Sequence, residues 1–562
     1  MESLPVNTDG FSERTLVMTT HTMLGNTGIQ LAVSHIMRHY FSIPKFYIET
    51  NNRVYVNMVK IDDDIWENIY PFLGSILPPR FDLIHTSYVC MQGYFQISEP
   101  LVRNRQMILE KFKSDTTTVS TLFTMKDCMA AKSPIHIDPE DIVLHIRLGD
   151  FIKAKIVIDP APQLAILRNT KMNRLIIVCS APKTDAERNY LLLFEEFHPI
   201  FQHGTELEDF AVLRCANRIL VTNSTFSWFA AFLGSARDRW IPVPKYNELK
   251  KIDETDILYE AADGYDIGAL SIPETPFLPV SGEFLQSLCD YTILDRVKKS
   301  DFNKTIDYAH PPERQLFIEE SWPDSVRNAT SLFIYPTENN SIGRHVFSFH
   351  WPNLKLIIFH NSDYGLDYDS ILPFLEKNPD VYIWAQNSTE WHPRIRPLPI
   401  GEENRIWRGG NEIYEPPNTI SRSNQRDIDI LVPHWSNTHP IRPIWRKQAM
   451  ERRDITIVPK LNKGDYLERV TESRAIVCPP GNGVDTHRCW DALTKGAWAI
   501  VEGNTHTLAL LKQYPSLHLI SVKDMTSPIH VPDELPPFHP LLLRSFWETL
   551  FRSYIICGIS PI

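Results

Sequence analysis

The chain has 562 residues, of which 43% are hydrophobic and 22% charged, and its formal net charge is −11. One hydrophobic core stops growing at about 250–300 residues, so we expect at least two large units. The acidic balance argues against general affinity for nucleic acid or for anionic membranes.

Short apolar runs alternate with helical stretches along the first half. The expected strands are residues 15–20, 141–148, 174–180, 218–223 and 239–244. The spacing of apolar residues predicts a helix over 28–41, and Ser224 and Gly234 suit the start and the end of another. Short strands that are apolar throughout and alternate with helices are typical of parallel sheets covered on both faces.

Residues 271–315 are first proline-rich and then polar, so we expect them to connect two domains, 1–270 and 316–562. A second series of expected strands follows, at 331–337, 354–362, 381–387, 427–435, 454–459, 474–480 and 498–504. A helix over 485–496, closed by Gly496, joins the last two strands as a βαβ crossover. A polar, proline-rich break at 411–427 could separate two lobes of this domain.

The first twenty residues carry no basic segment followed by an apolar one, so we expect no signal peptide. There is no uninterrupted apolar run of 18 or more residues, and we expect no transmembrane segment. The eight cysteines are scattered without a C-x-x-C pair, which indicates neither a zinc ribbon nor a disulfide framework. We therefore expect a soluble, cytoplasmic protein, and the sequence leaves its oligomeric state open.

Polar residues stand at the ends of three expected strands in the first half, at the edge where open α/β sheets bind ligands. The glycine-asparagine pair before the first helix exposes backbone N–H groups, although such a pair is more often only a turn. The arginine, glycine and acid after strand 141–148 could equally form a surface ion pair. Hydroxyls before helix 224–234 suit an anionic oxygen or simply cap the helix. The candidate residues are Gly25 and Asn26; His145, Arg147 and Asp150; and Asn223, Ser224, Thr225 and Phe226.

These segments read "TMLGNTGIQ", "HIRLGD" and "NSTFSWF". In order and content they resemble the motifs of the family 11 glycosyltransferases, the α-1,2-fucosyltransferases, over residues 15 to 250. Thr27, Ile29 and Leu148 depart from the family pattern. The resemblance implies that GDP-fucose is the donor and that Arg147 contacts its diphosphate.

A fixed guanidinium at Arg147 would stabilise the negative charge that builds on a departing diphosphate. Asp150 would orient Arg147 or the loop, while Ser224 and Thr225 would hold phosphate oxygens with the helix N-terminus behind them. His145 is equally compatible with a structural role and with contact to the donor.

The second half contains "IVCPPGNGVDTHRCWDALTKGAWAIVEG", residues 476–503. A strand runs into a glycine-rich loop, then into a helix that carries His487, Arg488 and Asp491 on one face. Gly481 and Gly483 could let the backbone approach a ligand closely, although the spacing of a P-loop is missing. A helix of this kind could also be a plain interface.

This stretch, together with "FHNSDYG", "WAQN" and "LPIGEENRIW", resembles the C-terminal lobe of exostosin-like glycosyltransferases over residues 330 to 505. The resemblance implies that Asp491, in place of the usual glutamate, binds the nucleotide ribose and that Arg488 faces the diphosphate. It does not fix the donor. The candidate donor-binding residues are Gly481, Asn482, Gly483, Asp485, His487 and Asp491, with Arg488 as a catalytic candidate.

The two resemblances imply an α/β chain of two tandem GT-B-type units, each with two Rossmann-like lobes. We expect a bifunctional glycosyltransferase whose first half transfers fucose, with inversion, from GDP-fucose to a sugar hydroxyl. The second half would transfer an unidentified sugar to the same glycan. The expected partners are sugar nucleotides and an oligosaccharide acceptor, without a metal or other cofactor. The sequence does not identify the general base.

Three other interpretations stay open. One half could be a non-catalytic carbohydrate-binding module that supports a single active transferase. A scaffold protein would bind no sugar nucleotide. A GT-A enzyme would hold manganese through Asp62, Asp63 and Asp64, although we favour the interpretation that these acids lie in the first turn of a helix.

Overall fold

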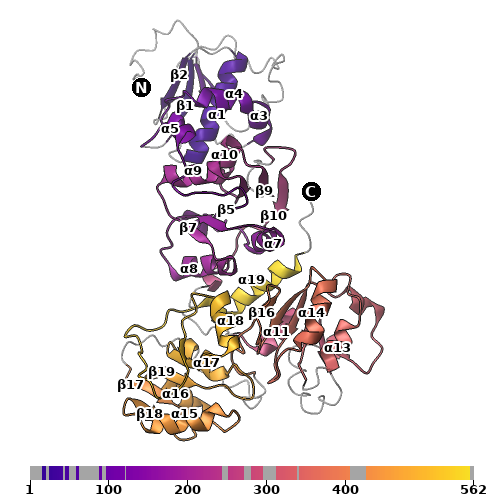
Figure 1. Cartoon of the computed structure of the whole chain (residues 1–562). Coiled ribbons are helices and arrows are strands. Elements are labelled where there is room, and N and C mark those ends of the chain that lie inside the picture. Colours follow the sequence, from indigo (N-terminus) through magenta and orange to yellow (C-terminus); the bar gives the residue numbers. More distant parts are fainter. Residues whose placement is uncertain are drawn as a thin grey trace. The chain divides into compact units, whose positions relative to one another are not determined.

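The computed structural model describes residues 15–19, 24–41, 45–49, 58–61, 88–91, 97–119, 122–243, 251–270, 280–294, 312–337, 341–404 and 426–556 (Figure 1). These residues divide into two compact units. Unit 1 holds the described residues up to Ala181 and from Phe197 to Asp266, and unit 2 holds Pro182–Glu196 and those from Ile267 onward. Within the described ranges, no helix has the length and hydropathy needed to cross a membrane.

Two parallel sheets form from the described residues of unit 1, with strand orders β2-β1-β4-β3 and β10-β9-β8-β5-β6-β7. Numbered from β5, the larger sheet has the order 6-5-4-1-2-3 of a Rossmann-like doubly wound sheet. The strands are β1 (Thr15–Thr19), β2 (Lys45–Glu49), β3 (Met58–Ile61), β4 (Tyr88–Met91), β5 (Ile142–His145), β6 (Leu175–Val178), β7 (Ile200–Gln202), β8 (Arg218–Leu220), β9 (Asp238–Val243) and β10 (Ile257–Glu260).

Helices cover these sheets, and one hydrophobic core runs from the first helices to the larger sheet. The helices of unit 1 are α1 (Leu24–Phe41), α3 (Ser98–Arg103), α4 (Arg105–Phe112), α5 (Met125–Ala130), α6 (Asp150–Ala154), α7 (Ala161–Asn169), α9 (Glu206–Cys215) and α10 (Thr225–Leu233). Helix α1 packs against α10 so closely that a Cβ atom on Gly28 would overlap the ring of Phe229. The glycine therefore sets the distance between the two helices.

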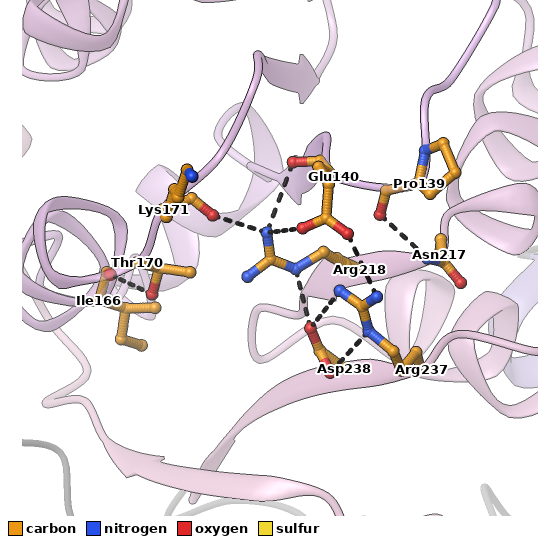
Figure 2. A network of polar contacts seen from close by, with 9 residues as sticks. All are labelled: Pro139, Glu140, Ile166, Thr170, Lys171, Asn217, Arg218, Arg237 and Asp238. Carbon is orange, nitrogen blue, oxygen red and sulfur yellow. Dashed lines mark hydrogen bonds and ion pairs between the residues drawn. The ribbon is translucent and has the colours of Figure 1, made fainter.

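Arg218, the first residue of β8, lies at the amino-terminal ends of the strands of the larger sheet (Figure 2). Its guanidinium donates to Asp238 Oδ2 at 2.8 Å and to the carbonyl of Lys171 at 2.8 Å, and its Nη1 lies 3.4 Å from Glu140 Oε2. Arg237 also donates to Asp238 and Glu140. A buried guanidinium satisfied in this way ties β8 and β9 to the segments before β5 and β6.

Unit 2 also contains two parallel sheets in its described part, with orders β12-β11-β13-β14-β15-β16 and β18-β17-β19-β20-β21. The second has the order 2-1-3-4-5 of flavodoxin-like sheets. The strands are β11 (Tyr291–Leu294), β12 (Gln315–Phe317), β13 (Ser331–Ile334), β14 (Leu356–Phe359), β15 (Tyr382–Ala385), β16 (Ile395–Pro397), β17 (Ile428–Val432), β18 (Ile455–Ile457), β19 (Ser473–Cys478), β20 (Trp498–Glu502) and β21 (Ile520–Val522).

The helices of unit 2 come before, between and after these strands along the chain. They are α8 (Asp185–Leu192), α11 (Gly282–Leu288), α13 (Ser341–Phe347), α14 (Tyr368–Lys377), α15 (Ile441–Met450), α16 (Lys463–Thr471), α17 (His487–Thr494), α18 (Thr505–Gln513) and α19 (Arg544–Ile555), with short 3-10 helices η2 (Glu195–Phe197), η3 (Ile267–Leu270), η4 (Pro312–Arg314), η5 (Asp324–Asn328) and η7 (Pro540–Leu542). Each of the two sheets has its own hydrophobic cluster.

The predicted connecting region, 271–315, is wrong for residues 280–294. These form helix α11 and strand β11, and β11 pairs with β12 on one side and β13 on the other. The short run "YTIL" was not recognised as a strand because its neighbours in the sequence are proline-rich and polar. The two sheets of unit 2 separate between β16 and β17, and most of the predicted break at 411–427 lies outside the described residues.

Candidate functional site

In the larger sheet of unit 1, the chain builds β5, β6 and β7 in one direction and then returns to build β8, β9 and β10 in the other. The strand order therefore reverses between β5 and β8, which pair at Val143↔Ile219 and Leu144↔Leu220. A crevice outside the carboxyl ends of two such strands is the usual ligand site of a doubly wound sheet. Two predicted motifs, "HIRLGD" and "NSTFSWF", follow these two strands.

Arg147 follows β5 and is held by its neighbour Asp150. Its Nε and Nη2 atoms donate to the two carboxylate oxygens of Asp150 at 3.2 and 2.8 Å, and its Nη1 lies 3.5 Å from Ser224 Oγ. Gly149, with φ +47°, turns the chain into α6 between them. The Arg147 side chain is 24% exposed and that of Asp150 is 61% exposed. Asp150 thus orients the guanidinium, and a ligand phosphate would have to share it.

His145 ends β5 as a neutral, buried imidazole. Its Nδ1 atom lies 3.3 Å from Thr222 Oγ1, and its ring lies 5.5 Å from that of Phe226. Burial, and then the nearby Arg147 guanidinium, lower the pKa of His145 to about 3. Phe226 in turn packs on Phe210 and the hydrophobic core. The geometry of His145 and Phe226 is that of core residues beneath the site.

The residues that begin α10 divide into two kinds. Ser224 is buried at the N-cap position, but its side chain makes no capping hydrogen bond, and Thr225 is the first helical residue. Asn223 Nδ2 donates instead to the carbonyl of Ile156 and to Asp263 Oδ1, at 2.7 and 2.8 Å. Asn223 therefore fixes the loop after β8, while the hydroxyl of Ser224 lies beside Arg147 at the helix start.

The predicted turn at Gly25-Asn26 is wrong in detail. Helix α1 already begins at Leu24, so both residues lie in its first turn. Asn26 is buried. The acids Asp62, Asp63 and Asp64 lie outside the described residues, so the structure does not test them. Among the residues it does describe, no three or more His, Cys, Asp or Glu side chains are grouped so as to hold a metal.

Unit 2 contains a pocket of about 450 Å³ at the place where the order of its second sheet reverses, between β17 and β19. Its walls come from the loops after β17 and β18 and from the starts of α16 and α17. The lining residues are Pro433, His434, Trp435, Ser436, Val458, Pro459, Lys460, Leu461, Asn462, Lys463, Tyr466, Thr486, His487, Arg488 and Asp491, with Glu403 from the first sheet's side.

The charges of this pocket are arranged around Lys463, the first residue of α16. Its Nζ atom lies 2.8 Å from Asp491 Oδ2 and 3.7 Å from Glu403 Oε2. The Asp491 carboxylate is 5% exposed, so this ion pair is largely buried. Lys460 and Arg488 add two more cations to the walls. The predicted ribose-binding acid is therefore already occupied by a lysine.

Arg488 and His487 begin α17 and face the pocket. Arg488 Nη2 donates to the carbonyl of His434 at 3.2 Å, and no described acid is within ion-pair distance of its guanidinium. His487 Nδ1 donates to the carbonyl of Gly401 at 2.8 Å. This hydrogen bond fixes the tautomer in which Nε2 of neutral His487 is an acceptor. The N-termini of α16 and α17 both open into this pocket and favour an anion there.

One polar group of the pocket is buried without a protein partner. The hydroxyl of Tyr466 has no solvent exposure and makes no hydrogen bond to any described residue. Buried hydroxyls are nearly always hydrogen-bonded, so such a group is a site where a ligand or water supplies the partner. Sequence reasoning missed Tyr466, Lys460, Lys463 and Glu403, because nothing in their local pattern marks them and only the fold brings them together.

Gly481, Gly483 and Asp485, in the loop before α17, do not line the pocket, contrary to the prediction. A Cβ atom on Gly481 would lie 2.9 Å from Arg442 Nη2, and one on Gly483 would lie 2.7 Å from Asn387 Nδ2. The glycines therefore allow protein side chains, and not a ligand, to approach the loop. Asn482 donates to Asp363 at 3.1 Å.

Asp485 is an internal anchor of unit 2. Its carboxylate accepts hydrogen bonds from the backbone of Ile400 at 2.8 Å and from Trp490 Nε1 at 2.9 Å. Burial alone would raise its pKa, but the neighbouring His506 imidazole and these hydrogen bonds outweigh burial and hold the pKa below its usual value. Asp485 therefore helps to position the start of α17.

No protein-family model and no curated protein matches the chain. Among solved structures, the chain is similar to a Listeria monocytogenes protein assigned as a UDP-N-acetylglucosamine 2-epimerase. The match has 10% sequence identity, covers 67% of this chain and 81% of that chain, and has a TM-score of 0.13. A TM-score this low carries no argument about fold or function.

Proposed function

We propose that the chain is a glycosyltransferase of the GT-B type, and that the pocket of unit 2 holds the diphosphate of its sugar-nucleotide donor. One observation carries the proposal: three cations, Lys460, Lys463 and Arg488, and two helix N-termini converge on one pocket where the strand order reverses. Cations and helix N-termini are the groups that hold phosphate oxygens in proteins.

The size and lining of the pocket suit a nucleotide. Its volume of about 450 Å³ lies in the usual range for small-ligand sites. Apolar side chains, among them Val458, Pro459 and Leu461, line the wall after β18 and can cover a base or ribose. Tyr466, whose buried hydroxyl has no partner among the described residues, also lines this pocket. Arg488, which has no described acid beside it, is the group we assign to the departing diphosphate.

A second donor site in unit 1 is supported by the meeting of Arg147 and Ser224 at the other reversal of strand order. Their motifs resemble those of α-1,2-fucosyltransferases, so GDP-fucose is the donor proposed for this unit. On this view the chain is bifunctional and transfers two sugars to one glycan. The guanidinium of Arg147 is already hydrogen-bonded to Asp150. This contact favours a second candidate function, in which unit 1 only binds carbohydrate and supports the transferase of unit 2.

Each proposed site acts through the same chemistry. A hydroxyl oxygen of the acceptor attacks the anomeric carbon, and the bond from that carbon to the diphosphate breaks. The leaving diphosphate gains negative charge in the transition state, where a preorganised guanidinium and helix N-terminus stabilise it more than in the ground state. Arg488 performs this role in unit 2, and Arg147 performs it in unit 1.

A thermal-shift screen tests the proposal. Full-length protein is heated with UDP-, GDP-, ADP- and CDP-sugars, because a ligand that binds only the folded protein raises the melting temperature. We expect a rise with at least one sugar nucleotide that is lost in Arg488→Ala and kept in Arg446→Ala, a control for an arginine outside the pocket lining. If GDP-fucose is the donor of unit 1, its shift is lost in Arg147→Ala. No shift with any sugar nucleotide would refute the proposal.

A further inference from the structure

A transferase of this type needs a group that accepts the proton of the attacking hydroxyl. Two acids line the pocket of unit 2, Asp491 and Glu403. Asp491 is buried and its Oδ2 is ion-paired to Lys463 at 2.8 Å, so one of its two oxygens is already engaged. Glu403 is 32% exposed at its side chain and lies farther from the same lysine, at 3.7 Å. It is therefore the acid that an incoming hydroxyl can reach.

Glu403 reaches the pocket on a segment separate from those that carry the diphosphate-binding groups. It follows β16 in the first sheet of unit 2, whereas the other lining residues belong to segments 433–436, 458–466 and 486–491 around the second sheet. Arg488 and the two helix N-termini belong to these segments. In a direct displacement the attacking oxygen and the leaving diphosphate lie on opposite faces of the anomeric carbon, so the donor would have to lie between Glu403 and Arg488.

The loop that carries Glu403 is held rigidly at its neighbours. The backbone N–H of Ile400 donates to Asp485, and the carbonyl of Gly401 accepts from His487 at 2.8 Å. The N–H of Glu402 donates to the carbonyl of Val280 at 2.9 Å. Asn404 is fixed by a 3.0 Å hydrogen bond to Asn361 and a 3.2 Å one from the N–H of Glu283.

Such anchoring on both sides of one acid positions its carboxylate, whose ion pair with Lys463 is a long one of 3.7 Å. Preorganisation of this kind is what a general base requires, because misplacement by a fraction of an ångström is costly to catalysis.

We propose that Glu403 is the general base of the transfer in unit 2, an inference that rests on the proposed function. As the acceptor oxygen bonds to the anomeric carbon, its proton passes to a carboxylate oxygen of Glu403. The electron pair of the breaking carbon–oxygen bond leaves with the diphosphate. Attack from the Glu403 side inverts the anomeric configuration. His487, whose Nδ1 is bound to Gly401 and whose Nε2 is also an acceptor, is the competing candidate that the test distinguishes from Glu403.

The test uses full-length protein and the sugar nucleotide that gives the largest Arg488-dependent thermal shift, and it measures release of the nucleoside diphosphate. We expect Glu403→Gln to lower kcat by about 100-fold or more, with the KM for the donor changed by less than about threefold. The acidic limb of the pH–rate profile should disappear with it. Formate, a small carboxylate, should restore part of the rate of Glu403→Ala. Glu468→Gln, an exposed acid of α16 outside the pocket, is the matched control.

The outcomes separate this inference from the proposed function. If titration calorimetry finds no binding of UDP, GDP, ADP or CDP, both fall. If the protein binds and turns over a sugar nucleotide but Glu403→Gln keeps its rate, only the assignment of Glu403 is overturned. Loss of the pH limb in His487→Gln but not in Glu403→Gln would move the role to His487. Retention of the anomeric configuration would also overturn the assignment.

Discussion

The Nζ atom of Lys463 lies 2.8 Å from Oδ2 of Asp491, inside the pocket of unit 2. Lys463 is the first residue of α16, and Asp491 lies in α17. Their ion pair therefore links two walls of the pocket. A buried carboxylate without its lysine would keep the cost of desolvation and lose the compensating charge. The pair therefore stabilises the pocket before any ligand arrives.

Replacing Lys463 by methionine should lower the free energy of unfolding of unit 2 by about 2 kcal/mol, because it leaves Asp491 buried and unpaired. Urea denaturation followed by tryptophan fluorescence measures the loss. Lys460→Met is the control, since Lys460 is exposed and in no ion pair with a described residue; it should change stability by less than about 0.5 kcal/mol. If both variants unfold alike, the pair contributes nothing.

Gly483→Ala should destabilise unit 2 by about 1–3 kcal/mol and weaken nucleotide binding. The new methyl group would displace Asn387, whose Oδ1 accepts the N–H of Asp485 at 3.2 Å and so helps to position α17. Gly365→Ala is the matched control, because its Cβ would lie 3.4 Å from the same residue, an ordinary contact. Differential scanning calorimetry compares them, and equal melting temperatures would contradict the packing role of Gly483.

Two arginines at opposite edges of the larger sheet of unit 1 should behave differently. Arg218→Ala removes a buried guanidinium from Asp238, Glu140 and Lys171 and should cost about 3 kcal/mol of stability. Arg147→Ala breaks an ion pair with an acid that is 61% exposed and should cost less than about 1 kcal/mol. Chemical denaturation ranks the two. A larger loss for Arg147 would mean that this residue is a structural anchor and not a ligand-binding group.

His145 should make unit 1 less stable as the pH falls. Its pKa is about 3 in the folded chain, below the usual 6.5, so between these values the unfolded chain binds the extra proton. Stability therefore changes little above pH 6.5 and drops below it, by up to about 1.4 kcal/mol per pH unit from this one group. Unfolding of wild type and His145→Asn between pH 7 and pH 4 measures the difference. Parallel curves would show that His145 titrates normally.

The sequence predicted those elements whose signals are local. Buried runs such as "SLFI" at 331–334 became strands, and Gly234 and Gly496 follow α10 and α17 as expected. Strand β11 was not predicted because a run of four residues, "YTIL", is too short to show a periodicity among prolines and charges. The larger sheet's reversal point could be inferred only in general terms, since strand order is not written in any one strand.

The sequence predicted those pocket residues that lie within one motif at a helix start, such as Arg488 and His487. It did not predict those whose partners come from distant segments: Glu403 and Lys463 are 60 positions apart and meet only through the fold. Gly481 and Gly483 suggested a ligand-binding loop, but the sequence could not tell that Arg442 and Asn387 fill the space they leave. A glycine in a sequence can indicate that another group lies close to the backbone, but it does not indicate whether that group is a side chain or a ligand.

The most direct test of the central claim is titration calorimetry of UDP, GDP, ADP and CDP into the full-length protein and into Arg488→Ala. We predict that at least one nucleoside diphosphate binds wild type and that its Kd rises about tenfold or more in the variant, because one charge-assisted contact to the diphosphate is lost. Absence of binding by all four, or equal affinity in the two proteins, would contradict the account.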